Sequence, residues 1–347
     1  ADMEGISGVV HWDQTDSKHA EYARFRKLMT GDVNAAIQGA YDAGAEEVIV
    51  ADGHGSARNI LIEELDPRAR LNSGTLSPYA MVQGVDSGIQ AALFVGYHAR
   101  AGSQNGILDH TWSSSLVANV WLNERAVGEI GLNAAVCGHF QVPVIMISGD
   151  QTACAEATEL LGPVETAVVK QASGRMAAEC LPPEVTEVRI YEAAQKAVSR
   201  FAAGQAVEPF RNDVPDTMAV ELVTSEMADK AMLIPGARRS HGKRVEVTAD
   251  DVPTVDIGDS DPTSVAEDAV APITGTIAVT EGADQDGTLD VTLTSGVLGS
   301  DISIDLDGLT DQSVTASVTV GTAPDDQTLG DLTVSYTAAT GVVTWSF

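Results

Sequence analysis

The chain has 347 residues, which is enough for at least one large core and for two domains. Its net charge of −30 excludes the basic surface that nucleic acid binding requires and favours cationic ligands, including metal ions. No apolar run is long enough to cross a bilayer, so neither a nucleic acid nor a membrane is an expected partner.

The first five residues contain Asp2 and Glu4 one residue apart. A lone D-x-E pair is a weak motif, and it is more typical of a solvated acidic terminus than of two metal ligands. Both interpretations stay open on this motif alone.

Strand-like and helix-like segments then alternate. Apolar residues recur at spacings of three and four from Tyr22 to Ala40 and predict one helix, which Gly44 ends. Short buried strands are predicted at 46–50, 91–98, 142–150 and 166–171, helices at 131–140 and 151–161, and a hairpin over 117–129 that turns near Asn123. This order predicts an α/β fold with a mostly parallel sheet flanked by helices.

The cysteines, Cys137, Cys154 and Cys180, form an odd and widely spaced set. That set argues against a disulfide scaffold and suits a reducing compartment, so a cytoplasmic location is expected. Cys137 and His139 resemble a metal pair, but the inner face of a helix is the favoured interpretation.

The composition changes after Arg244, the last basic residue. Residues 253–347 contain 16 acidic residues and no Lys or Arg. We predict an α/β domain over 1–252, a Pro-, Asp- and Ser-rich linker over 253–272 and an acidic β-rich module over 273–347. Period-two alternation in that module predicts a small antiparallel β-sandwich of unknown role.

Three histidines of the first domain follow predicted strands. His54 and His98 come at strand ends, and His110 lies on a loop after His98. Pockets of open α/β sheets form outside the carboxyl ends of their strands, so His54 and His98 are expected to converge. Glu129 lies where the hairpin meets its helix, and this combination favours a metal site over isolated structural histidines.

These residues stand in motifs that resemble a known family. The motifs are ADMEGISG, ADGHGS, GYHARAG, LDHTWSS, VGEIGLNAAVCGHF, VPVIMISGD and VVKQ. In this order they resemble the D-aminopeptidase family of dinuclear zinc metallopeptidases from residue 2 to about residue 252. Each motif alone is weak, but the combination is specific.

The resemblance implies five ligands for two Zn²⁺ per chain: Asp2, Glu4, His54, His98 and Glu129. It implies that Asp2 bridges the ions, with Glu4 and His98 at one and His54 and Glu129 at the other. It also implies that His110 is the catalytic residue, described in the family as a nucleophile.

The chemistry fits these residue types, because imidazole and carboxylate groups suit zinc. Two zinc ions close together lower the pKa of a bound water. On chemical grounds we favour His110 as a general base over a nucleophile. Asp109 either orients the ring of His110 or is a loop residue.

The sequence departs from the family pattern at both ends. The family has a hydrophobic strand before its D-x-E-G motif, so a strand preceding Ala1 is expected to be missing here. The family also closes with a helix where this chain has the β-rich tail, which is either an appended module or the product of joined reading frames. The resemblance implies a ring-shaped decamer, and a tail in place of the terminal helix argues against that assembly.

The leading prediction is a metal-dependent aminopeptidase acting on short peptides with an N-terminal D-amino acid, of the D-Ala-D-Ala type. The alternative is a catalytically inactive binding or display protein whose β-rich tail supplies the function. A hydrolase that pairs His110 with Ser113, Ser114 or Ser115 is disfavoured, because the sequence lacks a G-x-S-x-G elbow.

Overall fold

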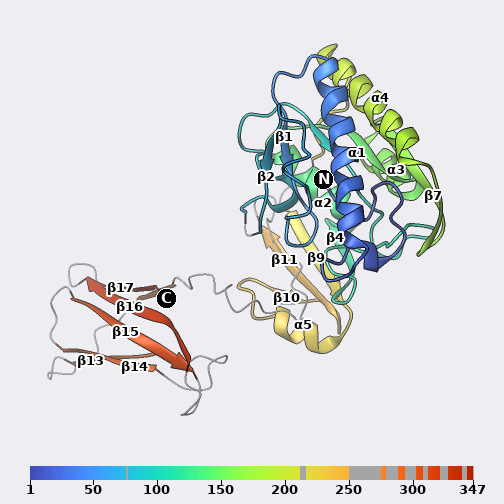
Figure 1. The fold of residues 1–347 in the computed structure, drawn as a ribbon. Coiled ribbons are helices and arrows are strands. Elements are labelled where there is room, and N and C mark those ends of the chain that lie inside the picture. The colour runs from blue at the N-terminus through green and yellow to red at the C-terminus, as the bar shows by residue number, and fades with distance from the viewer. Residues whose placement is uncertain are drawn as a thin grey trace. The chain divides into compact units, whose positions relative to one another are not determined.

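The computed structural model describes residues 1–75, 77–211 and 216–249, together with the backbone of six strands between 275 and 346. The chain divides into two compact units, Ala1–Ser260 and Asp261–Phe347 (Figure 1).

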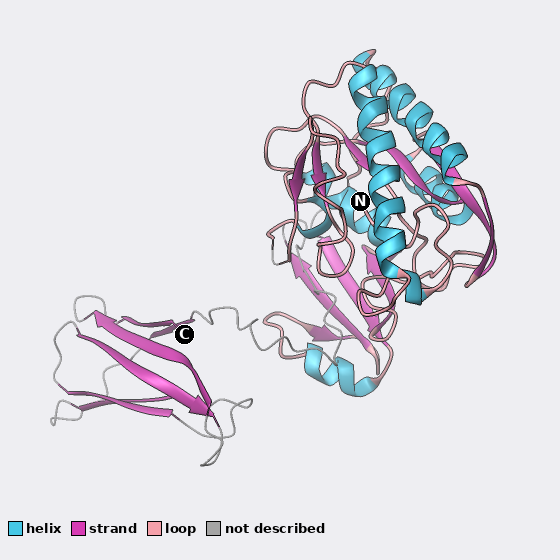
Figure 2. Ribbon diagram, in the orientation of Figure 1, coloured by secondary structure: helices cyan, strands magenta, loops and turns pink. Residues whose placement is uncertain are grey.

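The first unit combines helices with three sheets (Figure 2). Its described α-helices are α1 (Tyr22–Asp42), α2 (Glu129–His139), α3 (Gln151–Leu161), α4 (Pro183–Ala202) and α5 (Ser225–Ala231). Two 3₁₀ turns are η1 (Trp12–Gln14) and η2 (Ala80–Val82).

Its strands form a parallel pair, a four-stranded sheet and a five-stranded sheet. The pair is β1 (Ile49–Ala51) with β2 (Arg70–Asn72). The four-stranded sheet has the order β3 (Ala92–Phe94), β6 (Val144–Asp150), β7 (Glu165–Gly174) and β8 (Ala177–Cys180). The five-stranded sheet has the order β10 (Arg238–Arg239), β11 (Arg244–Ala249), β9 (Asp216–Leu222), β4 (Val117–Leu122) and β5 (Arg125–Val127).

The α/β class predicted from the sequence is confirmed, but the prediction of a mostly parallel sheet is wrong for much of the fold. Strands β3, β6 and β7 are parallel, whereas β8 runs antiparallel to β7. The five-stranded sheet is antiparallel throughout. The predicted hairpin β4–β5 pairs with β9, a strand far along the chain, and so it belongs to this second sheet.

Helices cover both faces of the four-stranded sheet. Ile145 and Val169 pack in the same apolar cluster as residues of α1 and α4, which lie side by side in Figure 1. Their sequence neighbours Val144 and Val168 pack with α2 and α3. Because side chains alternate across a strand, this division places the two helix pairs on opposite faces.

Helix α1 forms as the sequence predicts. Its residues at spacings of three and four, from Phe25 to Ala40, are buried in the core. The helix ends at Asp42, and Gly44 follows with φ +99°, a backbone conformation that glycine adopts without steric cost. Cys137 is buried within α2, which confirms the helix-face interpretation of the Cys137–His139 pair.

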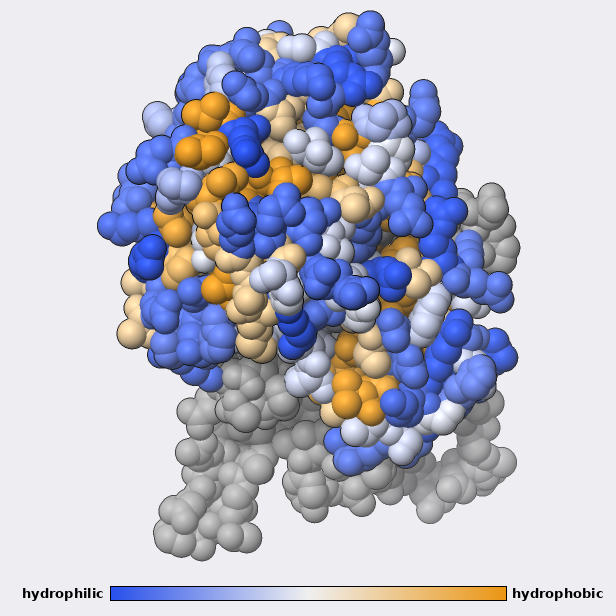
Figure 3. Space-filling model, turned by 90° about the vertical axis from the view of Figure 1, so that its right-hand side faces the viewer, coloured by the Kyte–Doolittle hydropathy of each residue, from blue (hydrophilic) through white to orange (hydrophobic). Residues whose placement is uncertain are grey.

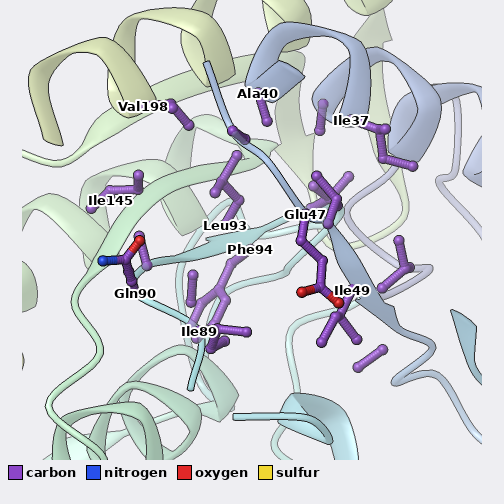
Figure 4. Close-up of a pocket in the computed structure, with 18 of the residues that line it drawn as sticks. Ile37, Ala40, Glu47, Ile49, Ile89, Gln90, Leu93, Phe94, Ile145 and Val198 are labelled. Carbon is purple, nitrogen blue, oxygen red and sulfur yellow. The ribbon is translucent and has the colours of Figure 1, made fainter. Parts of the chain in front are cut away.

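A cavity of about 760 Å³ lies between the unpaired edges of β1 and β3 (Figure 4). Its wall includes apolar side chains, among them Ile37 of α1, Val198 of α4, Ile49 of β1 and Leu93 of β3.

The first residues close one end of this cavity. The amino group of Ala1 donates to Ala51 O (2.7 Å), and Gly53 N donates to Ala1 O (2.8 Å). Asp2 N donates to Val95 O (2.8 Å), so residues 1 and 2 bridge the ends of β1 and β3. A strand preceding Ala1 lies outside this sequence and stays a prediction.

The second unit is described only as strand backbone. The strands are β12 (Gly275–Ala278), β13 (Thr288–Leu293), β14 (Ile302–Asp307), β15 (Gln312–Val320), β16 (Gln327–Thr337) and β17 (Val342–Ser346). Their pairings, β12 with β17, β17 with β16, β16 with β15 and β13 with β14, are antiparallel. The predicted sandwich packing and linker lie outside the described residues.

The described surface carries both hydrophilic and apolar residues. Figure 3 shows one face of the molecule on which hydrophilic residues predominate and apolar residues form small, interrupted areas. Within the described residues, no helix has the length and apolarity that a membrane span requires.

The close approach of α1 and α4 gives a test of the packing. A Cβ atom at Gly39 of α1 would lie 2.3 Å from the carbonyl oxygen of Tyr191 on α4, whereas one at Gly31 would meet only the end of the Glu187 side chain. We predict that Gly39→Ala lowers the free energy of unfolding by about 1–3 kcal/mol through overpacking.

Gly31→Ala is the matched control on the same helix. It replaces a helix-interior glycine by the best helix former, so the free energy of unfolding should rise by up to about 1 kcal/mol. Urea denaturation measures both variants. An equal effect of the two substitutions would contradict the packing described for this helix pair.

Candidate metal centre

The six residues singled out in the sequence lie together in the structure. Asp2 and Glu4 belong to a run of turns at the start of the chain, and Glu129 is the first residue of α2. His54 follows β1, and His98 follows β3, as the rule for strand ends predicts. All except His54 are buried, and the His54 side chain is only 14% exposed.

Asp2 lies at the centre of this cluster. Its Oδ1 is 3.6 Å from His54 Nδ1, and its Oδ2 is 3.3 Å from His98 Nε2. His54 Nδ1 also lies 3.0 Å from Glu4 Oε2, and His98 Nε2 lies 3.3 Å from Glu129 Oε2. One carboxylate therefore faces two His–Glu pairs, one with each oxygen.

Two groups of potential ligands result, and both contain atoms close enough to hold an ion. One is Asp2, Glu4 and His54, and the other is His98, His110 and Glu129. The structure therefore pairs Glu4 with His54 and Glu129 with His98. The resemblance implied the opposite pairing, Glu4 with His98 and His54 with Glu129.

The orientation of the three imidazole rings is set by backbone carbonyls. A carbonyl only accepts hydrogen bonds, so the ring nitrogen that contacts it carries the proton and the other nitrogen of a neutral ring presents its lone pair. Metal-binding histidines are held in this way. The bonds are from His54 Nε2 to Thr15 O (3.1 Å), His98 Nδ1 to Ala99 O (3.0 Å) and His110 Nδ1 to Leu108 O (2.8 Å).

Three buried atoms of the cluster make no hydrogen bond: Asp2 Oδ2, Glu4 Oε2 and His98 Nε2. The contact between His54 and Glu4 is short enough for an ion pair but lacks hydrogen-bond geometry at this oxygen. Buried polar atoms without partners are rare and costly. Cations placed between them would satisfy all three, so the residues present fit metal ions.

The electrostatics of the cluster point the same way. Burial opposes charge on His54 and His98, but the neighbouring Glu4 and Glu129 outweigh it and raise the pKa of both rings well above the usual value. Burial also acts to raise the pKa of Asp2, but His54 and His98 prevail and lower it. Without metal, the carboxylates therefore draw protons onto the imidazoles, which shows that the site requires positive charge.

Close backbone contact brings Asp2 next to His98. Gly5 N donates to Gly96 O (2.8 Å), in addition to the bond from Asp2 N to Val95 O. A Cβ atom at Gly5 would lie 1.9 Å from Tyr97 O, and one at Gly96 would lie 2.3 Å from Asp2 O. Gly96 also has φ +75°, so glycine is required there both for space and for conformation.

His110 is held by a constrained loop. Leu108 and Trp112, two residues before and after it, have φ of 50° and 59°, which is unfavourable for residues with side chains. Leu108 N donates to Arg175 O, and Trp112 N donates to Glu129 Oε1 (2.7 Å). These bonds stabilise the conformation of the loop on both sides of the histidine.

The ring of His110 lies between two other rings. It stacks on His98 with 4.0 Å between the ring centroids, and the ring of Trp12 contacts it edge-on at 5.2 Å. Its Nε2 is 3.8 Å from Glu129 Oε1.

Asp109 does not orient His110, because the ring bonds to Leu108 O instead. The Asp109 carboxylate accepts hydrogen bonds from Gly102 N and Arg175 Nε. Of the two roles considered for Asp109 from the sequence, that of a loop residue is the one observed. Of the three serines considered as nucleophiles, Ser113 Oγ lies 3.2 Å from Ser115 Oγ; Ser113 is partly exposed and Ser115 is exposed.

Carboxylates and imidazoles that converge at the strand ends of an α/β fold define a candidate metal-dependent hydrolase. Comparison with known proteins agrees: the model of the D-aminopeptidase family (peptidase M55) matches residues 1–256. A D-aminopeptidase of Bacillus subtilis (strain 168) is 39% identical over 241 residues, which cover 70% of this chain and 86% of that protein.

A solved structure is also similar. It is described as a zinc-dependent D-aminopeptidase DppA from Bacillus subtilis, a self-compartmentalizing protease. The TM-score is 0.69 at 37% identity, and the match covers 72% of this chain and 90% of that one. The chain belongs to the D-aminopeptidase family, which confirms the family and the enzyme class, a metal-dependent aminopeptidase, predicted from the sequence.

Sequence reasoning missed the groups that orient the histidines. Thr15 and Leu108 contribute backbone carbonyls, which any residue type could supply, so no motif marks them. Trp12 contributes a ring contact across nearly a hundred residues of sequence, which no local pattern reveals.

A buried carboxylate supports the segment that carries Asp2 and Glu4. Asp32 of α1 accepts hydrogen bonds from Ser7 N (2.8 Å) and Ser7 Oγ (2.8 Å). Ser7 Oγ also lies 2.6 Å from Thr186 Oγ1. Burial raises the pKa of Asp32 from 3.8 to about 6, although the bonds from Ser7 oppose this shift.

This pKa shift predicts a pH dependence of stability. Between pH 3.8 and about 6 the folded state binds a proton at Asp32 that the unfolded state does not, so the contribution of this group becomes less favourable as the pH rises through that window. Asp32→Asn removes the titration. We predict that the parent loses stability relative to this variant, by a few kcal/mol at most, between about pH 4.5 and pH 7.

Urea denaturation of both proteins at the two pH values measures the difference. Subtracting the variant removes the contributions of groups that titrate in both proteins, including the histidines of the metal centre. A difference that does not change with pH would contradict the raised pKa of Asp32.

Proposed function

We propose that the chain hydrolyses short peptides with an N-terminal D-amino acid, of the D-Ala-D-Ala type, at a centre with two Zn²⁺ per chain. The observation that carries the proposal is the placement of Asp2, which has one oxygen toward each His–Glu pair. Three buried atoms there, Asp2 Oδ2, Glu4 Oε2 and His98 Nε2, make no hydrogen bond. The zinc dependence of the similar Bacillus subtilis D-aminopeptidase supports the choice of metal.

In this proposal Asp2 would contribute one oxygen to each of two ligand sets. Glu4 and His54 would complete one ligand set, and His98 and Glu129 would complete the other. Nitrogen and carboxylate oxygen donors are the ligands that zinc prefers at catalytic sites. When bound, two zinc ions would supply Lewis acidity for a peptide carbonyl and lower the pKa of a water.

His110 is proposed as the general base. Its Nδ1 is committed to Leu108 O, so proton transfer takes place at Nε2. The proposal is supported by the distance of 3.8 Å from His110 Nε2 to Glu129 Oε1 and by the stacking of the ring on His98. The same closeness would let His110 act as a ligand instead, and the two roles differ in what a substitution does to metal binding.

The burial of the cluster has a chemical consequence. Asp2, Glu4, His98, His110 and Glu129 are each less than 10% exposed. Electrostatic interactions are stronger where water is excluded, so the charges that these side chains carry act on a bound substrate with little screening.

The remaining proposals concern organisation. Residues 1–252 form the catalytic domain, 253–272 the linker and 273–347 a separate β-rich module. The chain assembles as a homo-oligomer, for which we propose a ring-shaped decamer, in line with the self-compartmentalizing description of the similar structure. A cytoplasmic location fits the three cysteines, which are all free.

Metal binding and catalysis should separate between two histidines. We predict that His98→Ala loses zinc, because it removes a proposed ligand. It also removes the imidazole that lies between the carboxylates of Asp2 and Glu129. His110→Ala should retain zinc and lower the turnover of D-Ala-D-Ala by about 10²–10⁴-fold.

Zinc content by elemental analysis and hydrolysis rates measure these effects, with L-Ala-L-Ala as the stereochemical control. Chelation should abolish hydrolysis in the parent, and zinc should restore it. Equal loss of zinc in the two variants would make His110 a ligand. Absence of zinc from the parent would favour the inactive binding protein.

Removal of the β-rich module should leave catalysis unchanged. All six site residues lie between residues 2 and 129, and residues 273–347 contain no Lys, Arg, His or Cys with which to bind an anion or zinc. We predict that a chain ending at residue 252 keeps its kcat/KM for D-Ala-D-Ala. A large loss of kcat/KM in a folded truncation would show that the module takes part in the activity.

A further inference from the structure

Lys170 is a buried cation with no part in the proposed chemistry. It lies on β7 and is 1% exposed. Its ammonium group donates hydrogen bonds to three carbonyl oxygens, those of Glu4 (2.6 Å), Ile6 (2.9 Å) and Val9 (2.7 Å). An ammonium group has three protons, so one short segment of the chain uses all of its hydrogen-bonding capacity.

These carbonyls belong to the run of turns that begins with Asp2 and Glu4. Glu4 is 2% exposed, and Ile6 and Val9 are fully buried. Buried carbonyls need a donor, and loss of Lys170 would leave three of them without their shared partner. The ammonium group therefore helps to fix the direction in which these three carbonyls of the segment point.

The charge itself is costly at this position. Burial lowers the pKa of Lys170 to about 8, against the opposing effect of Asp150 and Asp32. An apolar side chain of similar length would avoid this desolvation but would provide no donor. The fold therefore places a buried charge where three carbonyls of one segment need donors.

We propose that Lys170 is a positioning residue for the metal centre, which aims the Glu4 carboxylate at its partner His54 by holding the Glu4 carbonyl. The inference rests on the proposed function, because it assumes that Glu4 is a metal ligand. A hydrogen bond at the Glu4 carbonyl fixes the backbone from which the carboxylate extends toward His54 Nδ1, 3.0 Å away. The groups that orient ligands in this way commonly change metal affinity by about 10–100-fold.

The test is zinc affinity of the metal-free protein, measured by competition with a chromophoric chelator. Lys170→Met keeps the length of the side chain and removes its donors, and we expect it to lower the affinity for the zinc ion that Glu4 would bind, the one that Glu4→Gln also weakens, by at least about tenfold. Circular dichroism checks that the variant is folded. Lys170→Gln, which keeps two donors on a shorter side chain, serves in the same measurement if the methionine variant does not fold.

A double-mutant cycle shows whether Lys170 acts through Glu4. Glu4→Gln weakens zinc binding by itself. If Lys170 positions Glu4, substituting it in the Glu4→Gln background should cause much less additional loss than in the parent. Fully additive losses would overturn the proposal, because they would show that Lys170 affects the centre by another route.

Val245→Ala is the control for lost stability. Val245 is buried in β11, within the apolar cluster of the antiparallel sheet, and it has no part in the metal centre. This substitution should lower the thermal midpoint and leave zinc affinity unchanged. Equal zinc affinities for Lys170→Met and the parent would refute the positioning role, whereas a parent that binds no zinc would refute the proposed function itself.

Discussion

The proposed metal centre depends on one steric constraint, the contact between the backbone of residues 2–5 and that of residues 95–97. Gly5 and Gly96 allow this contact, since a Cβ atom at either position would overlap a carbonyl oxygen. The contact places Asp2 beside the end of β3, directly before His98. Ligands from the start of the chain and from the four-stranded sheet therefore meet only because two peptide backbones approach without side chains between them.

The second requirement of the site is charge. Three buried carboxylates meet three imidazoles in a protein whose net charge is already −30. The raised pKa values of His54 and His98 show that the carboxylates recruit protons when they have no other cation. Divalent ions would replace these protons, so metal binding should be coupled to proton release and should weaken as the pH falls.

Much of the fold could be predicted from local pattern. Helix α1 follows its apolar period, and the β4–β5 hairpin turns at Asn123 and Glu124, which both have positive φ. Helix α3 begins where Asp150 caps it by accepting from Thr152 N and Ala153 N. The antiparallel sheet could not be predicted, because β4 pairs with β9 across about a hundred residues and neither strand encodes its partner.

The site shows the same division. Strand ends predicted where His54 and His98 lie, but Asp2 and Glu4 became credible ligands only through the resemblance of combined motifs. The carbonyls of Thr15 and Leu108, which orient His54 and His110, carry no sequence signal. Side-chain chemistry can be read from a motif, whereas the backbone groups that aim it depend on the folded chain.

The geometry distinguishes His110 from the other two histidines. His54 and His98 each have a nitrogen within 3.3 Å of a carboxylate oxygen, and such contacts suit ligands that keep one protonation state once an ion is bound. His110 Nε2 is farther from its carboxylate, at 3.8 Å, and the ring is located by Trp12 and His98 instead. A base must gain and lose a proton without losing its place. Packing between rings provides that, because it fixes the position of the imidazole while committing only Nδ1 to a hydrogen bond.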